Sequence, residues 1–264
     1  MRCVRWAVVG PLAFLLGGTP AFSWHDKGHR IVAAIAASRL SPAGRTLVRE
    51  LLAPGETLAD AAVWPDYDGR RIRELDVLHY VNIADGSQGY RREVDCPEGN
   101  CAIEALRWCE AQIADRNAPL HIRRIALRYL AHLTGDLHQP LHAGRAADRG
   151  GTTISLIYGG TVTSLHLFWD KDLVEMEEGE VEEVARRLVA GATPAEWESS
   201  KSGDPAEWAN ESLRLAMSHA YTIAPSGEPD EDYIRRAREV VRRRLLQAGL
   251  RLARVIDRLA AGAR

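Results

Sequence analysis

The strongest constraint on the fold is an amphipathic stretch at residues 120–137 that ends in a cluster of histidines and an aspartate. Its apolar side chains recur at spacings of three and four, at Ile122, Ile125, Ala126, Tyr129, Leu130 and Leu133. This periodicity predicts a helix with one buried face. On such a helix His132 and Asp136 lie four residues apart on one face, where both can contact one ion. We expect Pro140 to end the helix and the following turn to bring His142 back to the same place.

Two imidazoles and a carboxylate at this spacing suit a zinc ion. Zinc takes nitrogen and oxygen ligands at about 2.0–2.2 Å. The alternative is that His132 is an ordinary core histidine and Asp136 a capping residue. These two residues alone do not decide between the interpretations, so the rest of the chain has to.

Composition places the chain among ordinary globular proteins. It has 264 residues, 46% hydrophobic and 27% charged, and no Gly/Ser-rich or Pro-rich linker divides it. We therefore expect a single domain over residues 24–264. The formal net charge of −2 argues against a protein that coats nucleic acid through its own positive charge. If the protein binds nucleic acid, metal ions must provide the positive charge.

The first 23 residues have the pattern of an export signal. Arg2 and Arg5 precede an apolar segment at residues 6–16, and small residues occupy the −3 and −1 positions before Trp24. The apolar segment is too short to cross a membrane as a helix. Because cleavage before Trp24 removes two arginines and no acid, the net charge changes from −2 to −4. We expect an exported protein, periplasmic or secreted, with no membrane insertion after processing.

Cysteine usage fits an oxidising compartment. Cys3 lies in the export signal, and Cys96 and Cys101 bracket a short Pro/Gly/Asn turn that a disulfide can close. Cys109 is left over, in a predicted helix at residues 102–116, and we expect it to be a buried free thiol. A cysteine-ligated zinc is the alternative, but the sequence contains no CxxC pair.

A free N-terminus at Trp24 could itself bind a metal ion. An α-amine has a pKa near 8 and can lose its proton to a metal, closing a chelate ring with its own carbonyl oxygen. His29 follows five residues later. The cleavage site therefore predicts a set of ligands that exists only in the processed chain.

Two further polar residues are ambiguous when taken singly. Asp66 follows a Trp-Pro pair, and His79 lies in a segment at residues 76–83 whose alternating apolar residues predict an extended conformation. An aspartate after proline is more typical of a turn, and a histidine before tyrosine is more typical of a core. Neither residue predicts a metal site by itself.

The rest of the chain indicates a mainly α fold with one small hairpin. Strand-forming residues at 152–158 and 161–165 flank a Gly-Gly pair and predict the hairpin, which leads into His166 and Asp170, again four apart. Further helices are predicted at residues 30–40, 42–52, 181–190, 205–219 and 230–261. The last of these carries six arginines between positions 235 and 244, which we interpret as a solvated helix face rather than a nucleic-acid arm.

Placed side by side, the polar residues resemble a known family. Their order and spacing match the secreted zinc nucleases of the S1/P1 type, single-strand endonucleases that also act as 3′-nucleotidases. The match covers the mature chain, and the segments at residues 208–212 and 248–253 are similar as well. The matching positions are Trp24, His29, Asp66, His79, His132, Asp136, His142, His166 and Asp170.

The resemblance implies a mainly α, single-domain fold, shared with zinc phospholipase C, around three zinc ions. One ion is expected on Asp66, His79, His132 and Asp136. A second is expected on the amine and carbonyl of Trp24, on His29 and on Asp136, and the third on His142, His166 and Asp170. Two zinc ions that share Asp136 can lower the pKa of a water held between them, giving a hydroxide nucleophile. Asp66 and Asp136 are then the catalytic carboxylates.

The same resemblance implies a substrate class and its products. Single-stranded RNA or DNA is cut to products with 5′-phosphate ends, and 3′-mononucleotides give nucleoside and phosphate. A single strand is favoured because its phosphate must reach a recessed cluster with the base unstacked. Tyr80 falls at the base-stacking position of the family and Asn82 close to a base edge, although Tyr80 is interpreted equally well as a core tyrosine.

Two departures from the family pattern concern the residues expected to bind the substrate phosphate. The family commonly has a basic residue three positions after the ligand Asp66; this chain has Gly69 there, so Arg70 is the candidate in its place. The family also tends to have asparagine where this chain has Thr152, whose single hydroxyl replaces an amide. Since the ligand positions are intact, these changes bear on rate and substrate preference.

Two other functions remain compatible with the sequence. A zinc phospholipase C-like phosphodiesterase would have the same fold and a similar site, and hydrolysis of phosphatidylcholine rather than single-stranded DNA would identify it. A periplasmic zinc-binding protein without turnover would bind metal and cleave neither substrate. Nothing in the sequence sets the oligomeric state.

Four histidines lie outside the match. His25, His121 and His219 are expected to be surface or core residues. His138 lies six residues after His132, off its helical face, and is expected to support a ligand as a hydrogen-bond partner.

Overall fold

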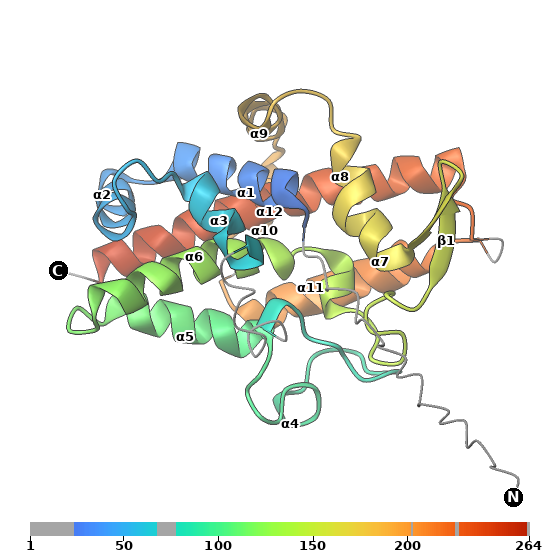
Figure 1. Cartoon of the computed structure of the whole chain (residues 1–264), viewed down its shortest axis with the longest axis horizontal. Coiled ribbons are helices and arrows are strands. Elements are labelled where there is room, and N and C mark those ends of the chain that lie inside the picture. The colour runs from blue at the N-terminus through green and yellow to red at the C-terminus, as the bar shows by residue number, and fades with distance from the viewer. Residues whose placement is uncertain (1–23, 68–77, 202, 225–226, 263–264) are drawn as a thin grey trace, which may run out of the picture.

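The computed structural model describes residues 24–67, 78–201, 203–224 and 227–262, and this part of the chain is mostly helical, as the sequence predicts (Figure 1). The helices are α1 (Asp26–Arg39), α2 (Pro42–Leu51), α3 (Leu58–Tyr67), α4 (Arg92–Asp95), α5 (Ala102–Ala114), α6 (Leu120–Asp136), α7 (Leu165–Leu167), α8 (Leu173–Glu175), α9 (Val181–Ala190), α10 (Pro194–Ser199), α11 (Pro205–Ser218) and α12 (Glu231–Ala261). Shorter turns are η3 (Pro140–Ala143), η4 (Phe168–Asp172) and η5 (Ala220–Thr222). The expected export signal at residues 1–23, Gly69 and Arg70 lie outside the described residues.

Helix α12 runs the length of the molecule and lies beside α1 (Figure 1). Its 31 residues extend over about 46 Å at 1.5 Å per residue. The Asp230 side chain caps its first turn by accepting the backbone N–H of Tyr233. The two helices approach so closely at Gly249 that an added Cβ would lie 2.5 Å from the Ile35 side chain. Glycine at this position therefore lets α1, which carries His29, pack directly on α12.

Helix α6 packs against α3 and α5, and every residue from Tyr129 to Asp136 is buried. The prediction of this helix is confirmed, but the expectation that Pro140 ends it is wrong. The helix ends at Asp136, and the chain then turns with the Gln139 N–H donating to the Asp136 carbonyl. Pro140 begins η3, a position where a backbone N–H would have no acceptor within the helix, so proline is tolerated there.

Two other boundaries differ from the expectation and affect the site. Helix α1 begins at Asp26 rather than at residue 30, so His29 is carried by a helix. The segment expected to be extended from residue 76 is extended only from residue 80 in its described part. There the Val81 N–H donates to the His142 carbonyl and the Ile83 N–H donates to the Gly144 carbonyl, each at 2.8 Å. These bonds hold the segment after His79 against the segment after His142.

The predicted hairpin is present, with shorter strands than expected. Strands β1 (Ser155–Tyr158) and β2 (Thr161–Ser164) pair antiparallel around Gly159 and Gly160, which have φ values of 56° and 75°. Positive φ at both central residues is the signature of a tight two-residue hairpin turn. Residues 152–154 do not join β1 because they belong to the turn that follows two left-handed glycines.

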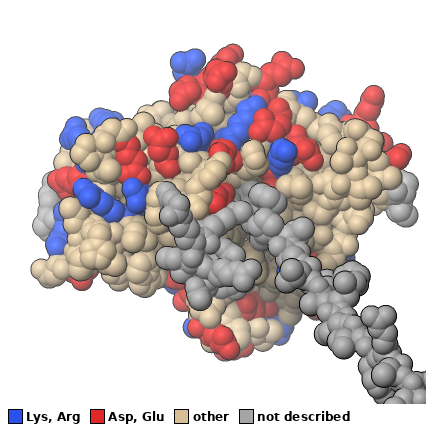
Figure 2. Space-filling view, viewed as in Figure 1, with Lys and Arg blue, Asp and Glu red and all other residues tan. Residues whose placement is uncertain are grey.

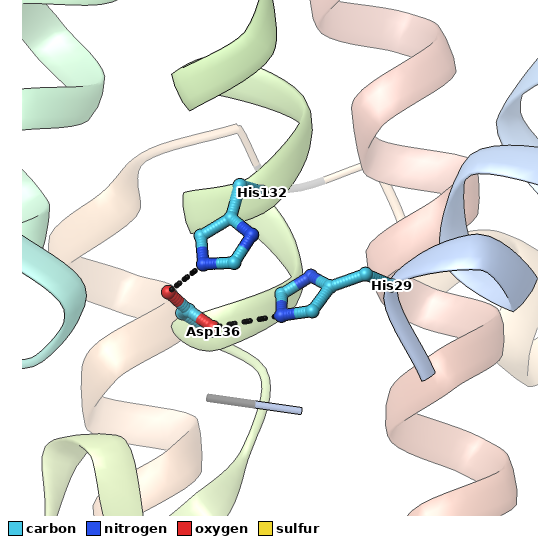
Figure 3. Close-up of side chains that lie close together, drawn as sticks. All are labelled: His29, His132 and Asp136. Atoms are coloured by element: carbon cyan, nitrogen blue, oxygen red, sulfur yellow. Dashed lines mark ion pairs between the residues drawn. The ribbon is translucent and has the colours of Figure 1, made fainter. Parts of the chain in front are cut away.

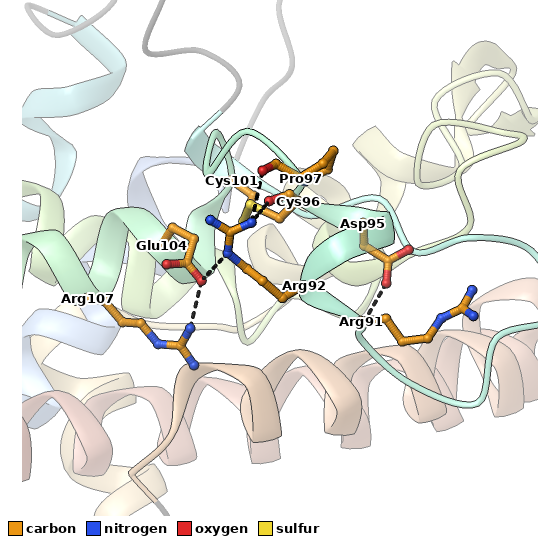
Figure 4. The surroundings of a disulfide bond; sticks show 8 residues. All are labelled: Arg91, Arg92, Asp95, Cys96, Pro97, Cys101, Glu104 and Arg107. Carbon is orange, nitrogen blue, oxygen red and sulfur yellow. Dashed lines mark hydrogen bonds and ion pairs between the residues drawn. A yellow bond between two sulfur atoms is a disulfide. The ribbon is translucent and has the colours of Figure 1, made fainter.

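The disulfide between Cys96 and Cys101 is present, as predicted (Figure 4). It closes the loop between α4 and α5, and the Ala102 N–H after it donates to the Tyr80 carbonyl at 3.1 Å. Cys109 is a buried free thiol, also as predicted. Burial raises the pKa of its thiol, so the sulfur stays protonated and unreactive.

The interpretation of the α12 arginines as a solvated face is wrong for one of the six, Arg244. Arg244 is only 1% exposed. Arg238 and Arg242 contact the carboxylate of Glu177, which is fully buried between α8 and α9. Both guanidinium groups remain partly exposed to solvent, so Arg238 and Arg242 lie on the solvated face with their charges paired to Glu177.

Positive and negative side chains are interspersed on the face of the molecule seen in Figure 2, and no single sign of charge covers it. This agrees with the small net charge of −2. None of the helices in the described part of the chain combines the length and the apolar composition that a membrane crossing requires.

Candidate metal centre

The centre begins where α1 and α6 pack together, and Figure 3 shows its first three side chains. His29 comes from α1, His132 and Asp136 come from α6, and all three are fully buried. The rings of His29 and His132 stack with their centroids 3.9 Å apart. His29 Nε2 lies 3.3 Å from Asp136 Oδ1, and His132 Nε2 lies 3.2 Å from Asp136 Oδ2. The helices come this close because residue 135 is glycine: an added Cβ would lie 2.9 Å from His29 Nδ1.

A second group of side chains shares His132 and Asp136 with the first. His79 Nδ1 lies 3.0 Å from Asp136 Oδ2 and 2.9 Å from His132 Nε2. Asp66, in the last turn of α3, places its Oδ1 3.7 Å from His132 Nε2. Asp136 therefore directs one carboxylate oxygen to His29 and the other to His79 and His132. A ligand that bridges two ions has to be placed in this way.

The third group combines His142 from η3, His166 from α7 and Asp170 from η4. His142 Nε2 lies 3.4 Å from Asp170 Oδ1, and His166 Nε2 lies 3.1 Å from Asp170 Oδ2. The Gln139 side chain donates a hydrogen bond of 2.6 Å to Asp170 Oδ1 and holds that carboxylate in place. The hairpin brings these residues together because β2 leads directly into α7. One possible ligand atom from each residue lies within 4.8 Å of the others in three sets: His29, His132 and Asp136; Asp66, His79 and His132; and His142, His166 and Asp170.

Backbone carbonyls orient three of the histidine rings. His132 Nδ1 faces the Ala62 carbonyl at 2.7 Å, His142 Nδ1 the His79 carbonyl at 2.8 Å, and His166 Nδ1 the Gly150 carbonyl at 2.7 Å. A carbonyl only accepts hydrogen bonds, so each Nδ1 carries the proton and donates it. In the neutral ring Nε2 is then an acceptor, and in all three residues it is the atom that faces a carboxylate. Two acceptors face each other stably only with a cation between them.

The pKa values of the histidines and of Asp136 likewise indicate that the centre favours a bound positive charge. Burial alone lowers the pKa of His132, but Asp136 and Asp66 outweigh it and raise that pKa to about 9. Burial likewise lowers the pKa of His142, and Asp170 raises it to about 9. Burial alone raises the pKa of Asp136, yet the charge and hydrogen bond of His132 hold it well below its usual range. Either protons on the histidines or bound metal ions can supply this positive charge.

The spacing of the atoms fits a metal ion. Ligand atoms about 2.0–2.1 Å from a tetrahedral ion are about 3.4 Å apart, close to the 3.1–3.4 Å between the paired His and Asp atoms of the first and third groups. Three buried atoms, Asp136 Oδ1, His142 Nε2 and Asp170 Oδ2, make no hydrogen bond to any residue that the structure describes. Imidazole nitrogens and carboxylate oxygens are ligands that zinc prefers. The donor set and its geometry therefore fit zinc.

Trp24 lies beside the first group and is fully buried. Its indole N–H donates to the Gly135 carbonyl at 2.8 Å, and the N–H of the next residue, His25, donates to the Asp170 carbonyl at 3.1 Å. The start of the expected mature chain is thus fixed between α6 and the segment that carries Asp170.

The expected substrate contacts are less well defined than the ligands. Tyr80 and Asn82 follow His79 and are both half-buried. The Thr152 hydroxyl donates to the Arg149 carbonyl at 2.8 Å, so in this structure it closes a local turn.

One supporting cluster has no signal in the sequence. Asp148 Oδ1 accepts the Gly151 N–H at 2.7 Å and the Tyr221 hydroxyl at 2.9 Å, while its Oδ2 accepts the Arg145 guanidinium. This holds three consecutive residues, 149–151, at φ values of 53°, 63° and 79°. The resulting turn presents the Gly150 carbonyl to His166. Tyr221 is 73 residues away from Asp148 in sequence, so no short sequence motif indicates that the two residues are in contact.

The histidines outside the match lie away from the three groups. His25 pairs with Glu175, His219 contacts Ser218, and His121 is exposed. His138 contacts no candidate ligand: its Nδ1 donates to the Thr134 carbonyl at 2.7 Å and its Nε2 accepts from Arg251 at 2.9 Å.

Fold and site together define a helical protein with three adjacent, buried His/Asp groups suited to metal ions. The family model described as S1/P1 Nuclease matches residues 24–261. The chain belongs to the S1/P1 nuclease family, as the resemblance in the sequence predicted.

Plant and fungal nucleases are among the relatives that are similar in sequence. Endonuclease 3 of Arabidopsis thaliana is 31% identical over 264 aligned residues, which cover 90% of each chain. Endonuclease 2 of the same plant is 29% identical, with 89% of this chain and 90% of that protein covered. Nuclease S1 of Aspergillus oryzae is 30% identical over 166 residues, or 60% of this chain and 57% of that protein.

Proposed function

We propose that this protein is an exported, trinuclear zinc phosphoesterase. It hydrolyses single-stranded RNA and DNA to products with 5′-phosphate ends, and 3′-mononucleotides to nucleoside and phosphate. Membership of a nuclease family supports the reaction class, and relatives named as endonucleases support the substrate class. The observation that carries the proposal is Asp136, whose two oxygens face two different groups of histidines.

Each ion is assigned to one group of side chains. The second group holds one ion through Asp66, His79, His132 and Asp136, and the third group holds another through His142, His166 and Asp170. The remaining ion is held by His29 and Asp136 of the first group, together with the N-terminal amine and carbonyl of Trp24 in the processed chain. The family match begins at residue 24, which supports the assignment of Trp24 as the first residue of the mature protein. The disulfide between Cys96 and Cys101 supports export to an oxidising compartment.

The protein groups act by holding and orienting. When bound, zinc supplies Lewis-acid chemistry, lowering the pKa of a water and neutralising phosphate charge. Asp136 fixes the spacing of the first two groups, and the backbone carbonyls of Ala62, His79 and Gly150 fix three imidazoles. Because the ligands are buried, a phosphate reaches them only from a strand whose bases are unstacked.

Substrate contacts are assigned to residues beside the ligands. Tyr80 stacks on a base and Asn82 hydrogen-bonds a base edge, since both lie within three residues of His79 in the chain. Arg70 contacts the phosphate in place of the basic side chain common in the family, and Thr152 replaces the amide when its hydroxyl turns from the Arg149 carbonyl to the phosphate.

The test is zinc content together with turnover, on protein that begins at Trp24. We expect about three zinc ions per chain and cleavage of single-stranded DNA, RNA and 3′-AMP. Asp136→Ala should abolish turnover and lower the zinc content by more than one ion, because it removes a ligand shared by two. His121→Ala, on an exposed histidine of the same helix, is the matched control and should change neither quantity. A variant Asp136→Ala that keeps three zinc ions would refute the bridge.

The N-terminus offers an independent test. A protein that keeps one extra residue before Trp24 should bind one zinc ion fewer and lose at least ten-fold in kcat/KM, because its amine is displaced from the site. Equal activity and zinc content in the extended and processed proteins would refute this role. Full zinc content with no turnover of nucleotides, combined with hydrolysis of phosphatidylcholine, would instead support the function of a zinc phospholipase C-like phosphodiesterase.

A further inference from the structure

A second concave site lies next to the metal centre, between α5 and α6. It encloses about 310 Å³, and its walls include Leu78, Trp108, Cys109, Ile125 and Tyr129. Leu78 directly precedes the ligand candidate His79, and the ring of Tyr129 lies 6.4 Å from the ring of His79. The pocket therefore shares a wall with the surroundings of His79.

We propose that this pocket binds one nucleobase of a single-stranded substrate while its phosphate occupies the metal centre. The proposal rests on the proposed nuclease function and adds a base-binding subsite to it. The volume lies at the lower end of the range for small-molecule sites, as expected for one nucleoside. Tyr80 is not among the described walls of the pocket, so this subsite is separate from stacking on that residue.

The walls suit the flat face of a base. Trp108 projects from α5 and is 46% exposed, although a large apolar side chain is usually buried. Ala105, Cys109 and Ile125 form an apolar interior behind it. A base stacked on an aromatic ring gains about 1–3 kcal/mol, whichever base it is. Trp108 therefore gives affinity for an unpaired base, and a duplex, whose bases are already stacked, gains nothing from it.

Glu104 adds a polar edge to the pocket and is the only charged residue among its described walls. Figure 4 shows its carboxylate between Arg92 and Arg107. Both arginines contact the same oxygen, Oε1, at 3.4 Å and 2.7 Å. The second oxygen, Oε2, accepts no hydrogen bond from any residue that the structure describes. A fixed carboxylate with one oxygen to spare is a hydrogen-bond acceptor for a ligand.

This acceptor discriminates between bases. The exocyclic amino group of cytosine donates to a carboxylate. Thymine and uracil present carbonyl oxygens at the equivalent position, which a carboxylate repels. The subsite thus favours cytosine over thymine and uracil, and the hydrogen bond to a charged group gives about a ten-fold difference.

The test compares oligo(dC) and oligo(dT) of equal length on the zinc-loaded, full mature chain. The wild type should cleave oligo(dC) with a kcat/KM about ten-fold higher. Glu104→Gln should bring the ratio close to one, because an amide also donates to a carbonyl. Trp108→Ala should raise KM for both substrates about ten-fold with kcat nearly unchanged.

Matched controls are Glu110→Gln, elsewhere on α5, and Trp197→Ala, on α10. Both should leave the substrate ratio and the KM values as in the wild type.

Hydrolysis of bis(4-nitrophenyl) phosphate, which has no base edge, separates the two proposals. If the wild type cleaves neither this ester nor the oligonucleotides, the proposed function fails. If it cleaves all of them but Glu104→Gln keeps the full cytosine preference, or Trp108→Ala leaves KM unchanged, the subsite is refuted. Zinc content and the melting temperature of each variant show whether it is folded and loaded.

Discussion

Two buried polar clusters start from the same end of α6, and they balance their charges differently. The metal centre contains three aspartates and five histidines whose nitrogen and oxygen atoms face each other at about 3 Å. The second, the arginine cluster, consists of His138, Glu211, Arg244 and Arg251. His138 is only two residues from Asp136, yet its side chain belongs to the other cluster.

Both arginines of the second cluster pair with a carboxylate of the chain itself, and of the Arg251 nitrogens Nε alone makes no hydrogen bond to a described residue. Arg251 and Arg244 both contact Glu211, at 2.6 Å and 2.7 Å. Arg244 also donates to the His138 carbonyl and to Ser212, and Arg251 donates to His138 Nε2. Burial would raise the pKa of Glu211, but its hydrogen bond to Arg251 and the charges of both arginines lower it. The carboxylate thus stays ionised, and no group from solution is required.

The comparison separates two uses of buried charge. In the arginine cluster the protein supplies both signs, so the cluster joins α10, α11, α12 and the end of α6 by itself. In the metal centre the protein supplies ligands, and the positive charge has to come from ions or protons. The first cluster is structural, whereas the stability of the second depends on what the solution contains.

Removal of metal should have the largest effect, and only on the metal centre. A ligand present at 1,000 times its Kd stabilises the folded state by about 4 kcal/mol per site. Chelation of three zinc ions should therefore lower the melting temperature by tens of degrees, and added zinc should restore it. Calorimetry at fixed free zinc measures this. A melting temperature that does not depend on zinc would show that protons alone balance the centre.

Glu211→Ala should lower the stability of the protein without changing its zinc content. It leaves two buried guanidinium groups uncompensated, which costs about 3–5 kcal/mol of unfolding free energy. Zinc content should remain unchanged, because Glu211 contacts none of the candidate ligands. Urea unfolding of the zinc-loaded protein gives the first quantity and metal analysis the second. Glu198→Ala, on an exposed residue paired with Lys201, is the control and should change neither.

The sequence predicted the local parts of this comparison better than the distant ones. Helix α6 and the hairpin follow from residue periodicity and a Gly-Gly turn, so a short window contains their signal. The orientation of His138 and the burial of Arg244 depend on how α11 and α12 pack against the end of α6. Likewise, only the folded chain shows that Gly135 lets His29 approach Asp136. Long-range packing has no signature in a short window, whereas resemblance to a family supplied the candidate ligand positions.

Between pH 6.5 and pH 9, metal-free protein should show a pH dependence that the arginine cluster lacks. His132 and His142 have pKa values of about 9, raised from 6.5 by their aspartates. A raised pKa contributes stability below the unfolded value, which is lost as the pH rises through the folded value. The chelated protein should thus lose several kcal/mol of unfolding free energy between pH 6.5 and pH 9. Arg244, whose pKa burial lowers to about 10, keeps its charge over most of this range.

Zinc-loaded protein is the control for that experiment, because bound ions replace the protons and remove the titration. Urea unfolding at the two pH values gives the free energies. Stability of the chelated protein that is constant or rises with pH would contradict the assignment of protonated histidines.

Tyr221→Phe should have the smallest effect and tests whether the third group depends on a distant support. The change removes the hydroxyl that donates to Asp148 and accepts the Arg145 N–H, while the ring remains. We expect a loss of about 1 kcal/mol in stability. Since the turn that Asp148 holds presents the Gly150 carbonyl to His166, one zinc ion should also bind about ten-fold more weakly. Titration with a competing chelator measures that affinity. Tyr158→Phe, whose ring contacts Phe168, is the matched control. A similar loss of stability with all three zinc affinities unchanged would mean that Tyr221 only supports the fold, and that the metal affinity of the third group does not depend on this distant contact.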